Sequence, residues 1–450
     1  MMRDAPSVIG RVVPGLLVAA ALAACTIYSP LPLDKTPSLK TSLSQLRHGG
    51  PALPAVLGVD DISMLAVEND PDLVAARHRA HVAEAQVLAA GILPNPSVTG
   101  NYGFLLGGPG TVASIAAGVS EDIKALVTLS SKRRAADAAA QQVNATILWQ
   151  EWQVIAKARL LAVDLVEGDE NLALSRQTLD LLQGRLDRSR AALAQGDATL
   201  SMVAPDVVAV AGIRKQIDDL NRQQATRRQD LNALLDLSPG TAVPLARQLG
   251  LPEIDAARAQ ALLQTLADRR PDLVALQLGY RAQEAKLRGA ILAEFPALAL
   301  GITGGRDNSD VRAIGPQITL DLPIFDRNQG NIAIERATRE QLRAEFTARL
   351  AAATGDIRAM MASQTLIEEQ LAKARPQVDE LAAIASRAGA AYAAGNLDER
   401  TYADLATAVL AKRQEIVALE QSLLDERVAI ATLIGAGMPP VLLPPEEPGT

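Results

Sequence analysis

The stretch LDLPIFDRNQGNIAIERA, residues 320–337, changes its hydrophobic period in the middle. Apolar residues alternate with other residues up to Phe325, which is the period of a β-strand, and from Asn331 they recur with the period of a helix. Five polar or small residues, 326–330, separate the two patterns. Such a patch is either a site that does chemistry or a connection between two elements.

Three residues favour a connection. Pro323 has no backbone N–H to donate, so it suits a strand that is about to end. Asn328 is predicted to cap the following helix, and Gly330 allows the chain to turn. The corresponding stretch in the first half of the chain, EDIKALVTLSSKRRAADA, carries different polar residues. We therefore interpret residues 326–330 as the joint between a strand and a long helix.

The chain repeats itself after about 200 residues. DPDLVAARHRAHVAEAQVLAAGILPNPSVTG begins at Asp70, and RPDLVALQLGYRAQEAKLRGAILAEFPALAL begins at Arg270. Further on, AQGDATL and AAGNLDE place glycines at 196 and 395. A repeat of this length indicates a duplicated half rather than a solenoid unit. We predict two repeats, at 58–250 and 251–438.

Each half is predicted to contain two strands followed by a long helix. Every strand has one apolar face and one small or polar face, the pattern of a membrane β-barrel with lipid outside and water inside. Four strands cannot close a barrel, so partner chains are needed, and a trimer would supply twelve strands. The predicted strands span about 95–104, 112–124, 296–304 and 312–325.

The predicted helices are unusually long. Residues 131–195 are free of proline and would span ~97 Å at 1.5 Å per residue. Residues 331–394 form a similar run, interrupted at Pro376. Shorter helices are predicted to pair end to end beside these two, at 60–91 with 199–236 and at 259–292 with 398–435. The predicted fold class is mainly α with some β, built from coiled-coil hairpins and four antiparallel strands.

The chain begins like a secreted lipoprotein. Residues 1–24 combine two arginines, an apolar run too short to span a bilayer and small residues before a cut, which describe a signal peptide. LAAC, ending at Cys25, resembles a bacterial lipobox, and the alternative is an ordinary signal peptide with an incidental cysteine. Since no other cysteine exists, disulfides and thiol catalysis are excluded. A Pro-rich arm follows at 25–57, and a loose tail at 439–450.

Composition excludes several classes of function. The net charge is −7 and no basic block occurs, so nucleic-acid binding has little support. No Gly-rich phosphate loop, G-x-S-x-G or HExxH motif is present. We expect no catalytic site and no cofactor.

The motifs together resemble the TolC outer-membrane factor family over residues 58–438. They are NDPDLVAA, RRPDLVAL, PNP before the first strand, LDLPIFDRNQGNIAIERA and AAGNLDERTYADLATAVLAKRQEI. The resemblance implies a homotrimer in the bacterial outer membrane, with a twelve-stranded β-barrel and a periplasmic α-barrel. It also implies partnership with a periplasmic adaptor and an inner-membrane transporter. LPIFDRNQGNIA is most similar to the branch that serves heavy-metal cation efflux pumps of the resistance-nodulation-division class.

The resemblance implies a passive exit channel for efflux, carrying metal cations or small toxic compounds, without enzymatic activity. An alternative of another class is the outer-membrane channel of a type I protein secretion system. A third reading, an enzyme or a helical scaffold, is disfavoured by the alternating strands and the lack of a catalytic constellation.

The acidic residues near the second hairpin turn are the main candidates for a functional site. Family members close their periplasmic end with inward-facing carboxylates, and Asp404 matches one such position, whereas Thr401 replaces the neighbouring carboxylate. Asp398 and Glu399 are further candidates for a gate or acidic ring, although Asp398 is also well placed as a helix N-cap. The hairpin tips offer adaptor contacts at Gly196, Asp197, Gly395 and Asn396.

One helix carries a possible metal-binding pattern. His78, His81 and Glu84 follow one another at three-residue spacing and share a helix face. The second copy has Leu278 and Arg281 at the matching positions, so the duplicated geometry does not require a metal. A solvated helix face is the preferred interpretation.

Overall fold

The structure is a computed structural model, and it describes residues 28–50, 52–251, 253–441 and 443. The chain divides into two units, Met1–Leu39 and Lys40–Thr450. In the first unit, residues 28–39 are exposed and form neither helix nor strand. The signal peptide, Cys25 and most of the predicted tail lie outside the described residues. All the helices and strands described lie in the second unit.

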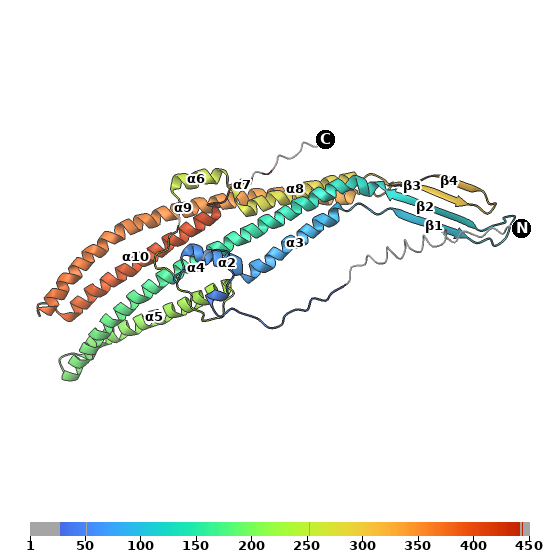
Figure 1. Ribbon diagram of the computed structural model, residues 1–450. Helices are drawn as coiled ribbons and strands as arrows, with labels where there is room; N and C mark the ends of the chain where they lie inside the picture. Colours follow the sequence, from blue (N-terminus) through green and yellow to red (C-terminus); the bar gives the residue numbers. More distant parts are fainter. Residues whose placement is uncertain (1–27, 51, 252, 442, 444–450) are drawn as a thin grey trace. The chain divides into compact units, whose positions relative to one another are not determined.

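Along the second unit, short helices, two strands and two long helices follow one another twice, with two helices before the strands in the first series and three in the second (Figure 1). After the short 3-10 helix η2 (Leu43–Gln45), the first series is α2 (Val59–Asn69), α3 (Pro71–Gly91), β1 (Ser97–Gly103), β2 (Ser114–Asp122), α4 (Ile123–Gln195) and α5 (Leu200–Leu234). The second series is α6 (Ala256–Gln264), α7 (Leu266–Arg269), α8 (Pro271–Leu292), β3 (Ala297–Arg306), β4 (Arg312–Asp321), α9 (Gln329–Ala393) and α10 (Glu399–Leu433).

The four strands form one antiparallel sheet in the order β1-β2-β3-β4. Val98 pairs with Val119, Val119 with Ile302 and Leu300 with Ile318, so these apolar residues share one face. The opposite face carries small and polar residues, including Thr99, Gly118, Thr303 and Gly315. The predicted alternation of faces is therefore confirmed by the strand register.

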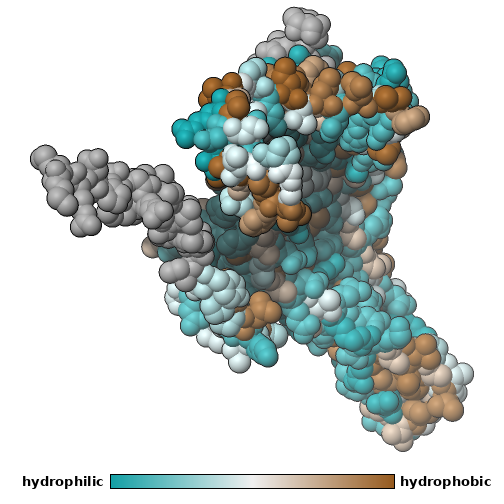
Figure 2. Space-filling model, turned by 90° about the vertical axis from the view of Figure 1, so that its right-hand side faces the viewer, coloured by the Kyte–Doolittle hydropathy of each residue, from teal (hydrophilic) through white to brown (hydrophobic). Residues whose placement is uncertain are grey.

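Charged residues bound the apolar face at both ends. Glu121 lies beside Leu300 at the helix end, and Arg306 pairs with Arg312 at the loop end. Between them, Ile314 to Leu320 of β4 cover ~20 Å at about 3.3 Å per residue. Ile314 is 81% exposed and Ile318 is 68% exposed. Figure 2, viewed from the strand end of Figure 1, shows exposed hydrophobic patches between hydrophilic ones.

Two long helices organise the rest of the unit. α4 has 73 residues and α9 has 65, which correspond to ~110 Å and ~98 Å. Near the sheet, α4 packs between α3 and α8, and α8 also packs on α9. Farther away, α4 packs between α5 and α10, and α10 packs on α9. The hairpins α4–α5 and α9–α10 therefore meet along the α4–α10 contact. None of the described helices is long and apolar enough to cross a membrane.

The apolar core lies about halfway along the helices. Leu57, Ile62 and Leu65 from the N-terminal part pack with Leu161 of α4 and Leu231 of α5. The second half builds an equivalent cluster from Leu266, Leu273, Ala353, Ile357, Ile430 and Ile434. Burial of such side chains contributes about 1.5–3 kcal/mol each, so these clusters fix where the shorter helices begin and end.

Several predicted boundaries differ from the structure. The helix predicted at 259–292 is three helices, because the chain leaves the helical path at Thr265, with φ −109°, and again at Arg270, which precedes Pro271 and is extended with ψ 117°. The helix predicted at 60–91, with an early break or cap near Pro71 and Asp72, is broken at Asp70, whose side chain accepts the N–H of Leu73. α4 begins directly after β2, since Asp122 caps it through the N–H of Ala125. The predicted start at 131 was too late.

The joint at the fourth strand also differs in detail. β4 ends at Asp321, so Leu322, Pro323 and Ile324 lie beyond it. Asn328 precedes α9 but makes no capping hydrogen bond with its side chain. With φ 64°, Asn328 instead donates from Nδ2 to the carbonyl oxygen of Ala290, 2.8 Å away. It therefore ties the joint to α8.

The predicted interruption at Pro376 does not occur, and α9 is continuous through it. Pro376 lies on the exposed side of the helix. A carbonyl freed by proline on that side can be hydrated, which lowers the cost of keeping the helix.

Candidate functional site

Both hairpin turns end their first helix with a glycine in the left-handed region. Gly196 has φ 86° and Gly395 has φ 74°. The next residue donates its N–H to the carbonyl oxygen five residues earlier, Asp197 to Ala192 at 2.9 Å and Asn396 to Ala391 at 2.8 Å. This glycine motif satisfies carbonyl groups at a helix end. The two predicted tips are therefore built in the same way.

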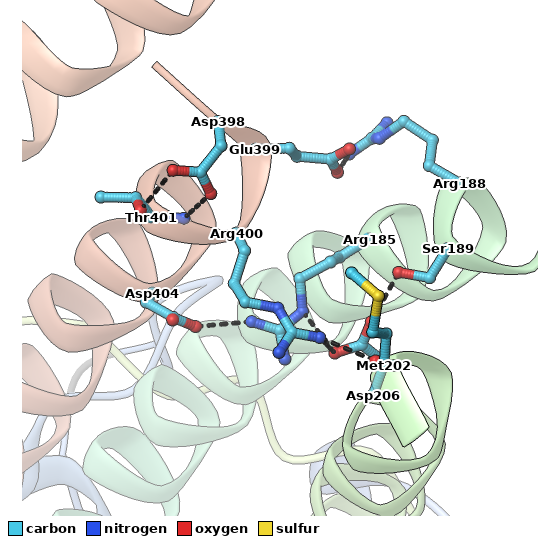
Figure 3. A network of polar contacts seen from close by, with 10 residues as sticks. All are labelled: Arg185, Arg188, Ser189, Met202, Asp206, Asp398, Glu399, Arg400, Thr401 and Asp404. Carbon is cyan, nitrogen blue, oxygen red and sulfur yellow. Dashed lines mark hydrogen bonds and ion pairs between the residues drawn. The ribbon is translucent and has the colours of Figure 1, made fainter. Parts of the chain in front are cut away.

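A buried carboxylate lies near the first tip. The Asp206 side chain of α5 is 1% exposed, and the Ser189 hydroxyl of α4 donates to its Oδ2 at 2.6 Å (Figure 3). Arg185 of α4 lies with Nε 2.9 Å from its Oδ1. Arg400 of α10 approaches the same oxygen at 3.4 Å. One carboxylate thus holds cations from both hairpins, and a buried charge needs such partners.

Asp404 extends this network across the α4–α10 contact. Its Oδ1 accepts a hydrogen bond from Nη1 of Arg185 at 2.5 Å. The Asp404 side chain is 63% exposed, whereas the Arg185 side chain is 10% exposed. Arg400 also donates to the carbonyl oxygen of Met202 at 2.8 Å. Arg185 and Arg400 therefore both join the first hairpin to the second.

The other two predicted acidic residues have separate roles. Glu399 forms an ion pair with Arg188 of α4, and this carboxylate raises the pKa of the Arg188 guanidinium above its ordinary value. Asp398 caps α10, accepting from the Thr401 hydroxyl at 2.7 Å and from the Thr401 N–H at 2.9 Å. These hydrogen bonds lower the pKa of Asp398. The N-cap interpretation of Asp398 agrees with this geometry.

Two tyrosines brace the second tip. Tyr392 of α9 and Tyr402 of α10 stack with ring centroids 5.3 Å apart and planes 4° apart. A Cβ at Gly389 would lie 3.2 Å from the Tyr402 ring, so the glycine admits the ring. The stack and the Arg185–Asp404 contact hold α10 on two sides.

The structure brings the predicted Asp404 and Glu399 onto α4, whereas Asp398 stays within its own turn. Gly196, Asp197, Gly395 and Asn396 form the tips, as predicted. Sequence reasoning missed Arg185 and Arg400. A signal existed, because Arg185 lies eleven residues before one turn glycine, and Asp206 and Asp404 lie ten and nine residues after theirs. Residues at about the same distance from a hairpin turn lie at about the same height along the paired helices, so this spacing places Arg185 beside the two carboxylates.

The histidine pattern on α3 is exposed. His81 Nδ1 lies 3.5 Å from Glu84 Oε2, and the rings of His78 and His81 are 5.9 Å apart. Within the described ranges, no group of three or more His, Cys, Asp or Glu side chains could hold a metal ion. The arrangement is that of a solvated helix face.

The sequence matches the family model described as "Outer membrane efflux protein" over residues 262–436. It is 30% identical to the outer membrane protein OprJ of Pseudomonas aeruginosa over 219 residues, 45% of this chain and 44% of OprJ. It is 24% identical to the pyoverdine export outer membrane protein OpmQ of Pseudomonas putida over 410 residues. That alignment covers 84% of this chain and 86% of OpmQ.

The fold agrees with these matches. A crystal structure of CusC superimposes with a TM-score of 0.67 at 19% identity, covering 92% of this chain and 100% of that chain. The chain therefore has the fold of CusC, and part of its sequence is similar to the outer membrane efflux proteins. The aligned part of the chain spans 44% of the length of OprJ. The matching family model describes outer membrane efflux proteins, and the prediction that the chain is not an enzyme agrees with it.

Proposed function

We propose that this protein is a TolC-like outer-membrane factor, a homotrimeric exit channel that passively conducts substrate from the periplasm to the exterior. The observation that supports this proposal is the exposed apolar face of the sheet. That face is bounded by Glu121 at one end and by Arg306 and Arg312 at the other. An apolar band between polar ends suits a membrane. β1 and β4 are the open edges of the sheet, and three copies joined edge to edge would close twelve strands.

In this proposal the tip network closes the periplasmic end. Asp206 and Asp404 tie α5 and α10 to Arg185, so the two hairpins are held together at their tips. Three-fold symmetry would repeat each exposed carboxylate as a ring of three, and acidic rings favour cations. Asp404 is the exposed member of the network, and Asp398 and Glu399 lie one to two turns nearer the tip. Opening requires the Arg185 contacts to break.

The N-terminus supplies the anchor in this proposal. Cys25 would be lipidated, and acyl chains contribute about 0.8 kcal/mol per buried CH₂. Cys25 itself lies outside the described residues. The protein would then be attached to the outer membrane by both its strands and its lipid.

The proposed partners are a periplasmic adaptor, which would meet the hairpin tips at Gly196, Asp197, Gly395 and Asn396, and an inner-membrane transporter of the resistance-nodulation-division class. The relatives are described as a pyoverdine exporter and a cation efflux protein. We propose metal cations or small toxic compounds as substrates. A channel for type I protein secretion is the second candidate, and its partner would be a protein-exporting ATPase.

Deleting the gene and complementing it tests this function. The proposal expects the deletion strain to become sensitive to one or more metal salts or small toxic compounds, and the wild-type gene to restore growth. It also expects the protein to sediment with the outer membrane, and expects Cys25→Ser to reduce that fraction. A wild-type protein that stays in the soluble periplasmic fraction would contradict the proposal. Loss of a secreted polypeptide without any change in sensitivity would favour the second candidate.

A further inference from the structure

The contact between α4 and α10 is a ladder of polar pairs that runs up from the tips. Arg185 pairs with Asp404 at its lower end. Higher up, Gln414 donates from Nε2 to the Ser175 hydroxyl at 2.8 Å, and Gln421 donates to Asp164 at 2.5 Å. Each of these rungs joins a donor to an acceptor. They hold the first hairpin to the second.

The part of the α4–α10 contact between the Ser175–Gln414 pair and the Asp164–Gln421 pair is different. There Glu167 of α4 and Glu420 of α10 line one groove of about 550 Å³, which α9 closes on its other side. Glu420 is paired with Arg375 of α9 at 2.9 Å. Glu167 forms no ion pair or hydrogen bond with any described residue. Glu167 and Glu420 therefore bring two carboxyls to one groove, whereas each neighbouring pair joins a hydrogen-bond donor to an acceptor.

A second unpaired carboxyl lies close by on α10. Oδ1 of Asp425 is buried and has no hydrogen-bond partner among the described residues. Arg227 of α5 acts on this carboxyl, but its Nη2 is already 3.0 Å from Oδ1 of Asp164. A buried carboxylate without a partner is costly, and protonation removes that cost.

Other charged groups do not neutralise this part of the contact. Arg427 is paired with Glu253, and Arg228 with Asp169, at 2.9 Å and 2.8 Å. The charged residues around Glu167 and Asp425 are, by element, Asp164, Asp169 and Glu170 of α4; Arg227 and Arg228 of α5; Arg247 and Glu253 of the connection; Glu368 and Arg375 of α9; and Glu420, Glu426 and Arg427 of α10.

We propose that Glu167 and Asp425 form a pH-responsive rung between the two hairpins, which holds them together when protonated and pushes them apart when ionised. The proposal rests on the exit-channel function only for its consequence, namely that the duct opens more easily as the pH rises. The titration itself belongs to the α4–α10 contact. It needs no substrate and no partner.

The electrostatics fit this assignment. Burial, together with Glu420, Glu170 and Asp425, raises the pKa of Glu167 to about 7. Burial and Asp164 raise the pKa of Asp425 to about 6, against the opposing effect of Arg227. Both groups therefore bind protons more tightly in the folded protein than in the unfolded chain. Their contribution to stability is fully present only below the ordinary pKa values of 4.5 and 3.8, and it is lost progressively as pH rises to the folded values of about 7 and about 6.

The test compares the full-length wild type, extracted in detergent, with the isosteric double variant E167Q/D425N. Thermal unfolding is followed from pH 4 to pH 8. We expect the melting temperature of the wild type to be close to that of the variant at pH 4 and to fall progressively below it up to pH 8. Infrared titration should show a protonated carboxyl band in the wild type that disappears between pH 5 and 8 and is missing from the variant. Glu380→Gln, an exposed carboxyl on α9, serves as the matched control.

Parallel melting curves for the wild type and E167Q/D425N across this range would overturn the proposal. The single variants E167Q and D425N give the same test if the double variant does not fold. Open probability in planar bilayers then separates the two claims. A titrating rung in a channel whose opening ignores pH would refute the regulatory role, whereas a titrating rung in a protein that never conducts would refute the exit-channel function alone.

Discussion

Replacing Asp206 with Asn should loosen the tips far more than replacing Asp404. The Asp206 side chain is 1% exposed and the Arg185 side chain is 10% exposed, so their ion pair at 2.9 Å is a buried one. Removing one partner of a buried pair costs about 3–5 kcal/mol. The Arg400 contact at 3.4 Å adds less than about 1 kcal/mol, because half of that side chain is in solvent. We expect a loss near ~3 kcal/mol for Asp206→Asn.

Asp404 is 63% exposed, and an exposed pair is worth about 0–1 kcal/mol. Hydrogen–deuterium exchange measures the difference, since a loss of ~3 kcal/mol raises local opening by about 150-fold. The amides of 185–195 and 200–210 should exchange that much faster in Asp206→Asn, and at most about fivefold faster in Asp404→Asn. Asp197→Asn, an exposed acid at the same tip, is the control. Equal protection in Asp206→Asn and the wild type would refute the argument.

Three further predictions follow from single residues. Gly395→Ala should destabilise the second tip by about 1 kcal/mol, because φ is 74° there, and exchange at residues 391–400 would measure it. Gly301→Val should prevent correct β2–β3 pairing, because a Cβ would collide with the Val119 carbonyl oxygen; trimer yield from membranes should fall, whereas Gly315→Ala, with open space, should not change it. Asp398→Ala should speed exchange at 399–404 near neutral pH. This difference should vanish as pH falls through the lowered folded pKa of Asp398, since a protonated cap stabilises the helix less.

Much of the fold could be predicted because its signals are local. Alternation along β1 to β4 depends on which face each residue takes, and the pairing of Val119 with Ile302 agrees with it. The two turn glycines could be located because φ above zero favours glycine. The duplication seen in the sequence stays a prediction, although short helices, two strands and two long helices follow in that order in both halves.

The predictions that failed did so because the deciding contacts join residues far apart in the sequence. Asn328 looked like a cap, yet its side chain reaches Ala290 on α8, a contact that only the packing of α8 on α9 creates. Asp206 was not among the predicted site residues, because its burial depends on α4, α5 and α10 meeting there. The predicted break at Pro376 followed a local rule that solvent exposure overrides.

The Arg270–Pro271 break was readable from the sequence and was overlooked. The residue before a proline avoids the helical region, and Arg270 does so with ψ 117°.

Single-channel recording in planar lipid bilayers tests the central claim most directly. The account predicts that the full-length protein inserts as a trimer and produces stepwise, cation-selective conductance, which is rare for the wild type and frequent for Asp206→Asn. Inserted protein that gives no conductance steps, for the wild type and for Asp206→Asn alike, would contradict it.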